Sequence, residues 1–88
     1  MTQQEIDQLF TENAAELNKM SVAAGSMVKA FIMALESNGP AYVKLSNAAA
    51  GGHTIDFAMV SGDAGLVPRV AGALGLSVSG NVITVPGG

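Results

Sequence analysis

Apolar residues recur with helical spacing along the first 37 residues of the chain. Steps of four and three residues continue without a break through the stripe Ile6, Phe10, Asn13, Leu17, Met20, Ala24, Met27, Phe31 and Ala34. This spacing is typical of a helix that packs along one side, as in a coiled coil. It predicts helix over residues 2–37, and it predicts that the stripe from Ile6 to Phe31 contacts another copy of the chain.

Both ends of this predicted helix carry capping signals. Thr2 and Glu5 match a capping box, in which each side chain accepts a hydrogen bond from a free backbone N–H of the first turn. At the other end, Gly39 suits the left-handed position after a helix, and Pro40 cannot continue one. The helix is therefore expected to stop close to residue 37.

Asn13 is the polar member of the stripe. In a coil of several helices such a residue sets the register at a cost in stability, so Asn13→Leu should then raise thermal stability. The alternative is that Asn13 faces water at a frayed helix end. Residues 27–35 are apolar nearly all round, which predicts burial on most sides of this segment.

One continuous helix and a hairpin broken at residues 18–21 are both compatible with the pattern. No proline and no Gly-Asn turn interrupts residues 11–24, which favours the continuous helix. Such a helix is about 54 Å long. A compact domain of this size is only about 30 Å across. A continuous helix would therefore need a neighbouring chain beside it.

The period changes in the second half of the chain. Apolar and polar residues alternate over 41–45 and 53–61, which predicts two strands with one buried face each. A short helix is expected within 64–75, and the Gly80-Asn81 pair predicts a hairpin over 76–85. The predicted order is α-β-β-α-β-β, an α+β fold with a mostly antiparallel sheet.

The composition is unusually apolar for a small chain. Hydrophobic residues make up 49% and charged residues 12%, so a single copy has few polar side chains with which to form its surface. The chain has no cysteine, and therefore no disulfide. We expect one small domain, 1–88, divided into a helical oligomerisation segment at 1–39 and an α/β unit at 40–88.

Charge and hydropathy limit the partners and the location. The net charge is −3 and four basic residues are spread along the chain, which argues against phosphate-backbone binding. The most hydrophobic window, residues 20–35, is shorter than the roughly 20 apolar residues of a membrane span. No basic, apolar leader is visible at the start. We expect a soluble cytoplasmic protein that binds no membrane, with incorporation into a virion as a further destination.

Catalytic and metal-binding patterns are weak. His53 and Asp56 are three positions apart on a predicted strand, so their side chains point to opposite faces and share no metal or proton. Every nucleophilic scheme must use His53, the single histidine of a chain without cysteine. The interpretation is a solvated loop histidine in a protein that is not an enzyme and that uses no metal, cofactor or small-molecule substrate.

Residues 69–77 resemble the first helix and the turn of helix-turn-helix DNA-binding proteins. The resemblance implies a regulator that contacts nucleic acid through residues 64–79. The segment that follows, 78–85, is rich in β-branched residues around a central Gly80, and no basic residue follows Arg69. A β-hairpin accounts for it better than a recognition helix, and no nucleic-acid partner is expected.

The leading functional hypothesis is a non-enzymatic, homo-oligomeric structural or assembly protein, such as a phage virion or accessory component. It rests on the helical stripe and on the small charge of the chain, by analogy of composition. The alternative is a small inhibitor or adaptor that binds a larger protein. Such an adaptor would use the acidic helix face or the hairpin edge, with Val78, Val82, Ile83 and Val85 as contact residues.

Overall fold

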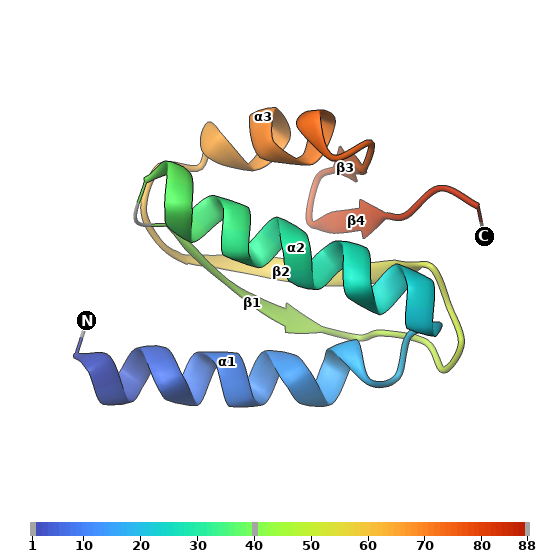
Figure 1. Ribbon diagram of the computed structural model, residues 1–88, viewed down its shortest axis with the longest axis horizontal. Helices are drawn as coiled ribbons and strands as arrows, with labels where there is room; N and C mark the ends of the chain where they lie inside the picture. Colours follow the sequence, from blue (N-terminus) through green and yellow to red (C-terminus); the bar gives the residue numbers. More distant parts are fainter. Residues whose placement is uncertain (1, 40, 88) are drawn as a thin grey trace.

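The computed structural model describes residues 2–39 and 41–87, apart from the side chain of Ile6. Three helices and four strands follow one another along these residues (Figure 1). In chain order they are α1 (Gln3–Leu17), α2 (Val22–Asn38), β1 (Tyr42–Ser46), β2 (Thr54–Ser61), α3 (Leu66–Ala73), β3 (Ser77–Ser79) and β4 (Val82–Thr84). The predicted α+β class and the positions of the strands and of the short helix are confirmed.

The single continuous helix that the sequence favoured is wrong, and the hairpin alternative is right. The chain reverses direction between α1 and α2, so the two helices run antiparallel (Figure 1). Ser21 begins α2 as its N-cap, with Oγ accepting from the N–H of Ala24 at 3.3 Å. The N–H of Gly51 donates to Lys19 O at 2.6 Å and thereby attaches the reversal to the β1–β2 loop. This fold-back lets the chain cover its own apolar stripe, and its longest dimension is 34 Å.

The outer ends of the two helices differ in how well the sequence predicted them. Thr2 is the N-cap of α1, with Oγ accepting from the N–H of Glu5 at 3.2 Å, as expected. Gly39 follows α2 with φ 160° and ψ 136°, an extended and not a left-handed backbone, so that part of the prediction is wrong. Pro40, the predicted helix stop, lies outside the described residues.

The four strands form one antiparallel sheet in the order β1-β2-β4-β3. Leu45 pairs with Phe57, and Ile55 pairs with Ile83, so apolar residues of neighbouring strands share one face. The β3–β4 turn contains Gly80 at φ 58°, a left-handed backbone that glycine adopts without steric cost. The predicted hairpin over 76–85 is thereby confirmed.

The core lies between one face of the sheet and the helices α2 and α3, while α1 lies beside the edge strand β1 (Figure 1). Phe31 and Leu35 of α2 have no exposed surface, and neither has Ile55 of β2. Within the part of the chain that the structure describes, none of the helices has the length and the apolar run that a bilayer span needs.

Candidate functional site

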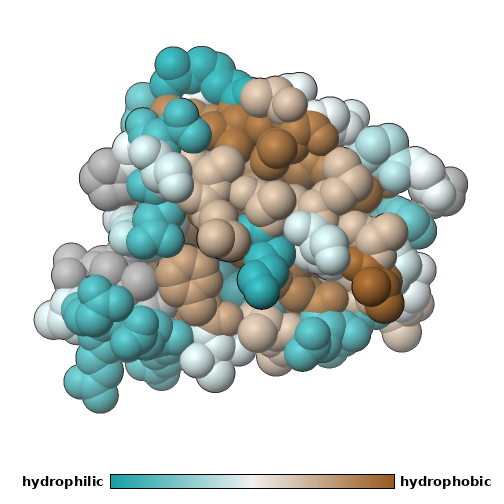
Figure 2. All heavy atoms as spheres, in the orientation of Figure 1, coloured by the Kyte–Doolittle hydropathy of each residue, from teal (hydrophilic) through white to brown (hydrophobic). Residues whose placement is uncertain are grey.

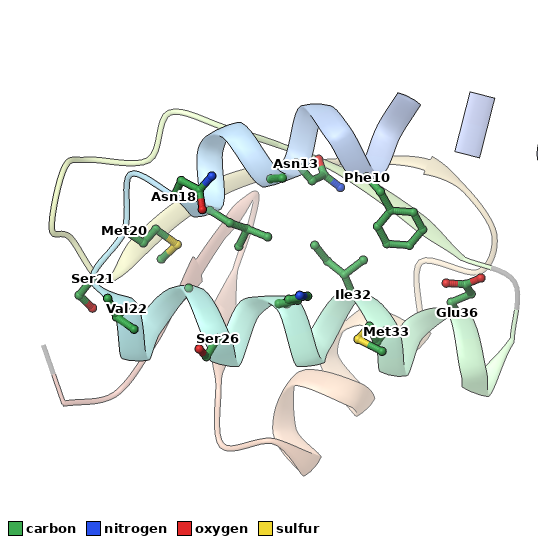
Figure 3. A pocket seen from close by; sticks show the side chains of 14 residues that line it. Phe10, Asn13, Asn18, Met20, Ser21, Val22, Ser26, Ile32, Met33 and Glu36 are labelled. Carbon is green, nitrogen blue, oxygen red and sulfur yellow. The ribbon is translucent and has the colours of Figure 1, made fainter. Parts of the chain in front are cut away.

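A groove of about 650 Å³ runs between α1 and α2, and we call it the hairpin groove (Figure 3). Both helices and the reversal between them supply its walls. Its lining consists of Phe10, Asn13, Ala14, Leu17, Asn18, Met20, Ser21, Val22, Gly25, Ser26, Lys29, Ile32, Met33 and Glu36. Most of this lining is apolar or small, so the groove is suited to an apolar side chain or helix surface and less to a charged ligand.

Asn13 joins α1 to the edge of the sheet. Its Nδ2 donates to Val43 O at 2.9 Å, and its Oδ1 accepts from the N–H of Leu45 at 2.9 Å. The side chain thus satisfies two backbone groups of β1 that face away from β2, as a neighbouring strand would. Asn13 is buried, so the prediction that it faces water is wrong. Both polar atoms of its amide are hydrogen-bonded to β1 of the same chain, so its burial is explained without a coil of several helices.

The opposite wall of the groove contains exposed apolar side chains on α2. Ile32 points toward α1 and is buried, whereas Val22 is 89% exposed and Met33 is 56% exposed (Figure 3). The expectation that residues 27–35 are buried on most sides is therefore wrong for Met33. Figure 2 shows this face as a broad, mostly apolar area with hydrophilic residues at its margins and one near its centre.

The exposed residues of α2 form a second regular stripe, which we call the outer stripe. Its members follow steps of four, three, four and three residues, and all are exposed. They are Val22, Ser26, Lys29, Met33 and Glu36. Sequence analysis missed this stripe because it followed the apolar spacing alone. The polar members Ser26, Lys29 and Glu36 are the signal that this side of α2 is uncovered.

The predicted oligomer interface falls mainly inside the chain itself. Four of its residues are buried, and three are partly buried against the core or in the hairpin groove. The buried ones are Asn13, Met20, Ala24 and Phe31, and the partly buried ones are Phe10, Leu17 and Met27. The side chain of Ile6 lies outside the described part of the structure. Packing within one chain therefore accounts for the spacing of this stripe.

The predicted binding edge of the hairpin is also mostly internal. Val82 and Ile83 lie on β4, which has β2 on one side and β3 on the other. Val85 is buried, and its N–H donates to His53 O at 2.8 Å. Of the four predicted residues, Val78 alone lies on an edge strand, and that strand, β3, has three residues. Short edge strands are poor templates for strand addition.

His53 lies in the loop before β2, as expected, but it is partly buried and not fully solvated. Its Nε2 lies 3.4 Å from Ser21 Oγ, and its buried Nδ1 has no hydrogen-bond partner among the described residues. A serine nucleophile needs a histidine that a third group orients. Here the same Ser21 oxygen accepts from the N–H of Ala24 as the helix cap. The contact holds the α1–α2 reversal against the β1–β2 loop.

The remaining titratable groups form surface pairs. Glu16 accepts from Lys19 Nζ at 3.1 Å and from the N–H of Ala48 at 3.2 Å, and these two hydrogen bonds lower the pKa of the Glu16 carboxyl. Lys44 Nζ of β1 lies 3.8 Å from Glu12 Oε2 of α1. Across the described residues, no three metal-ligating side chains gather at one place. The acidic residues of α1 thus contribute to attaching this helix to the sheet and the loop.

Comparisons of the chain with models of protein families, with curated proteins and with solved structures find no match. The functional argument therefore starts from the residues of the chain alone. Two features are available for it, the hairpin groove and the outer stripe that borders it.

Proposed function

We propose that the protein is a non-enzymatic assembly protein that associates with copies of itself through the face formed by the hairpin groove and the outer stripe. The observation that carries this proposal is the exposure of Val22 and Met33 on a helix that is apolar on its buried side as well. An exposed apolar face rimmed by polar residues marks a protein interaction surface. A second copy of the chain is present in every solution of the protein and is therefore available to cover this face.

The composition supports the same proposal. With 12% charged residues, the chain has few groups to keep its copies apart, and no disulfide strengthens a single copy. Small domains gain stability from oligomer formation when their own core is limited. Association through this face would remove Met33 from water, and each Å² of apolar surface so buried contributes about 25 cal/mol.

The experiment is a mass measurement by sedimentation or light scattering from about 10 µM to about 1 mM, the range of a moderate protein affinity. We expect a discrete oligomer that dissociates on dilution. Met33→Glu should shift the equilibrium to the monomer, because it places a charge in an apolar contact. Val60→Glu is the matched control, since Val60 is 43% exposed but lies on β2, outside the groove and the stripe.

Two results contradict the proposal. A species of 8.8 kDa at every concentration removes self-association. Equal loss of association in Met33→Glu and Val60→Glu shows that the copies meet elsewhere, and that the groove face has no special part in assembly.

A further inference from the structure

We propose that α2 packs antiparallel against α2 of a second copy about a two-fold axis beside Met33, with Lys29 of each copy facing the partner's Glu36. This inference rests on the proposed self-association and adds its geometry. Symmetric pairs of identical chains use one patch twice, so the patch has to be complementary to itself. The outer stripe meets this requirement in one register.

The two charges of α2 provide the first argument. Lys29 and Glu36 are the charged residues of this helix, both are exposed, and both belong to the outer stripe. Within the described residues neither of them forms an ion pair in its own chain. A cation and an anion seven positions apart, with Met33 between them, present opposite charges to a helix that runs the other way.

The possible registers provide the second argument. In an antiparallel pair of identical helices, the residue numbers of any two facing positions add up to the same value. Half of this value is the position of the two-fold axis along the helix. An axis beside Lys29 or beside Glu36 brings like charges together, and a parallel pair in register does so at both positions. An axis beside Ser26 pairs neither charge. Lys29 faces the partner's Glu36 when this sum is 65, which places the axis between positions 32 and 33, next to Met33, and the contact then occurs twice.

The residues around the axis provide the third argument. Met33 lies on the outward side of α2, and Ile32 projects toward α1 (Figure 3). Ala30 and Ser37 border the stripe and are exposed, so small side chains permit a close approach of the two helices. Methionine is unbranched and flexible, which suits a contact where two copies of the same side chain must share space. The neighbouring hairpin groove offers room for the partner's Met33.

Charge exchange tests this geometry. Lys29→Glu and Glu36→Lys should each weaken association about tenfold or more, because each change puts like charges together at both symmetric contacts. The double variant, with both changes, restores the opposite pairing and should return the affinity to within about threefold of the original chain. Arg69→Glu on α3 is the matched control, exposed and outside the stripe, and should leave the affinity unchanged.

Disulfide trapping provides a second readout, since the chain has no cysteine of its own. Met33→Cys should form a covalent dimer under mild oxidation, because residues beside a two-fold axis approach their own copies. Arg69→Cys should not form one at the same concentration.

The outcomes separate this inference from the proposed function. If the original chain associates but the double variant stays as weak as the single ones, the register is wrong while self-association stands. If the original chain associates but Met33→Cys gives no more covalent dimer than Arg69→Cys, the axis is wrong. If the original chain is a monomer throughout, both proposals fail together.

Discussion

The inner and the outer face of α2 both carry large apolar side chains, but in opposite surroundings. On the inner face, Val28, Phe31 and Leu35 have no exposed surface. On the outer face, Val22 and Met33 are mostly exposed. The difference arises from what lies opposite each face, the sheet and α3 on one side and the open groove on the other. An apolar helix surface thus acts as a core where the chain covers it, and is available for contact with another molecule where the chain does not.

The largest expected effect is the difference in stability loss between a truncation on the inner face and one on the outer face. Phe31→Ala leaves a cavity in the core and should lower the free energy of unfolding by about 3–5 kcal/mol. Met33→Ala removes an exposed side chain and should change it by no more than about 0.5 kcal/mol in a dilute, monomeric sample. Urea unfolding of both variants measures the contrast. Equal losses would mean that Met33 belongs to the core as much as Phe31 does.

The second effect concerns the attachment of α1, which forms the far wall of the groove. Asn13→Leu should lower the free energy of unfolding by about 2–3 kcal/mol, because it leaves Val43 O and the N–H of Leu45 without their partner. This is opposite to the gain expected if Asn13 belonged to a coil. Asn18→Leu, at an exposed position at the end of the same helix, is the control. A more stable Asn13→Leu variant would contradict the role of Asn13 at the strand edge.

The third effect concerns Ser21, the N-cap of α2, the helix that carries both faces. Ser21→Ala removes the acceptor of the Ala24 N–H and the contact with His53, and should cost about 1 kcal/mol. Ser21→Asp keeps an N-cap acceptor and should recover most of this loss. Thermal unfolding of the two variants gives the comparison. No difference between alanine and aspartate at this position would show that the cap contributes nothing.

The smallest effect is the acid sensitivity of the α1 surface. The pKa of Glu16 is lowered by the hydrogen bonds from Lys19 and from the N–H of Ala48, so the ionised carboxylate stabilises the folded chain. A lowered folded-state pKa contributes stability at neutral pH that is lost as the pH falls below about 4.5, through the pKa of the folded state. Glu16→Gln should therefore have a slightly lower Tm than the original chain at neutral pH. The difference in Tm between the two chains should become smaller in acid. A constant Tm difference across this range would contradict the assignment.

Local patterns in the sequence were sufficient for much of the fold. The alternation over 41–45 and 53–61 identified the buried faces of β1 and β2, because side chains on a strand alternate between its two faces. Gly80-Asn81 identified the β3–β4 turn, and Thr2 identified the start of α1, since both depend on bonds between residues close in the chain. Element types and the α+β class followed from such short-range rules.

The site depended on contacts between distant residues. The helix breaks at 18–21 because the β1–β2 loop binds the reversal, and Asn13 is buried because the edge of β1 needs its amide. The stripe of nine residues has the same spacing whether it faces another chain or its own sheet. Periodicity reports which residues share a side of a helix. What covers that side, and therefore why Met33 is exposed while Phe31 is buried, is set by the arrangement of all the elements together.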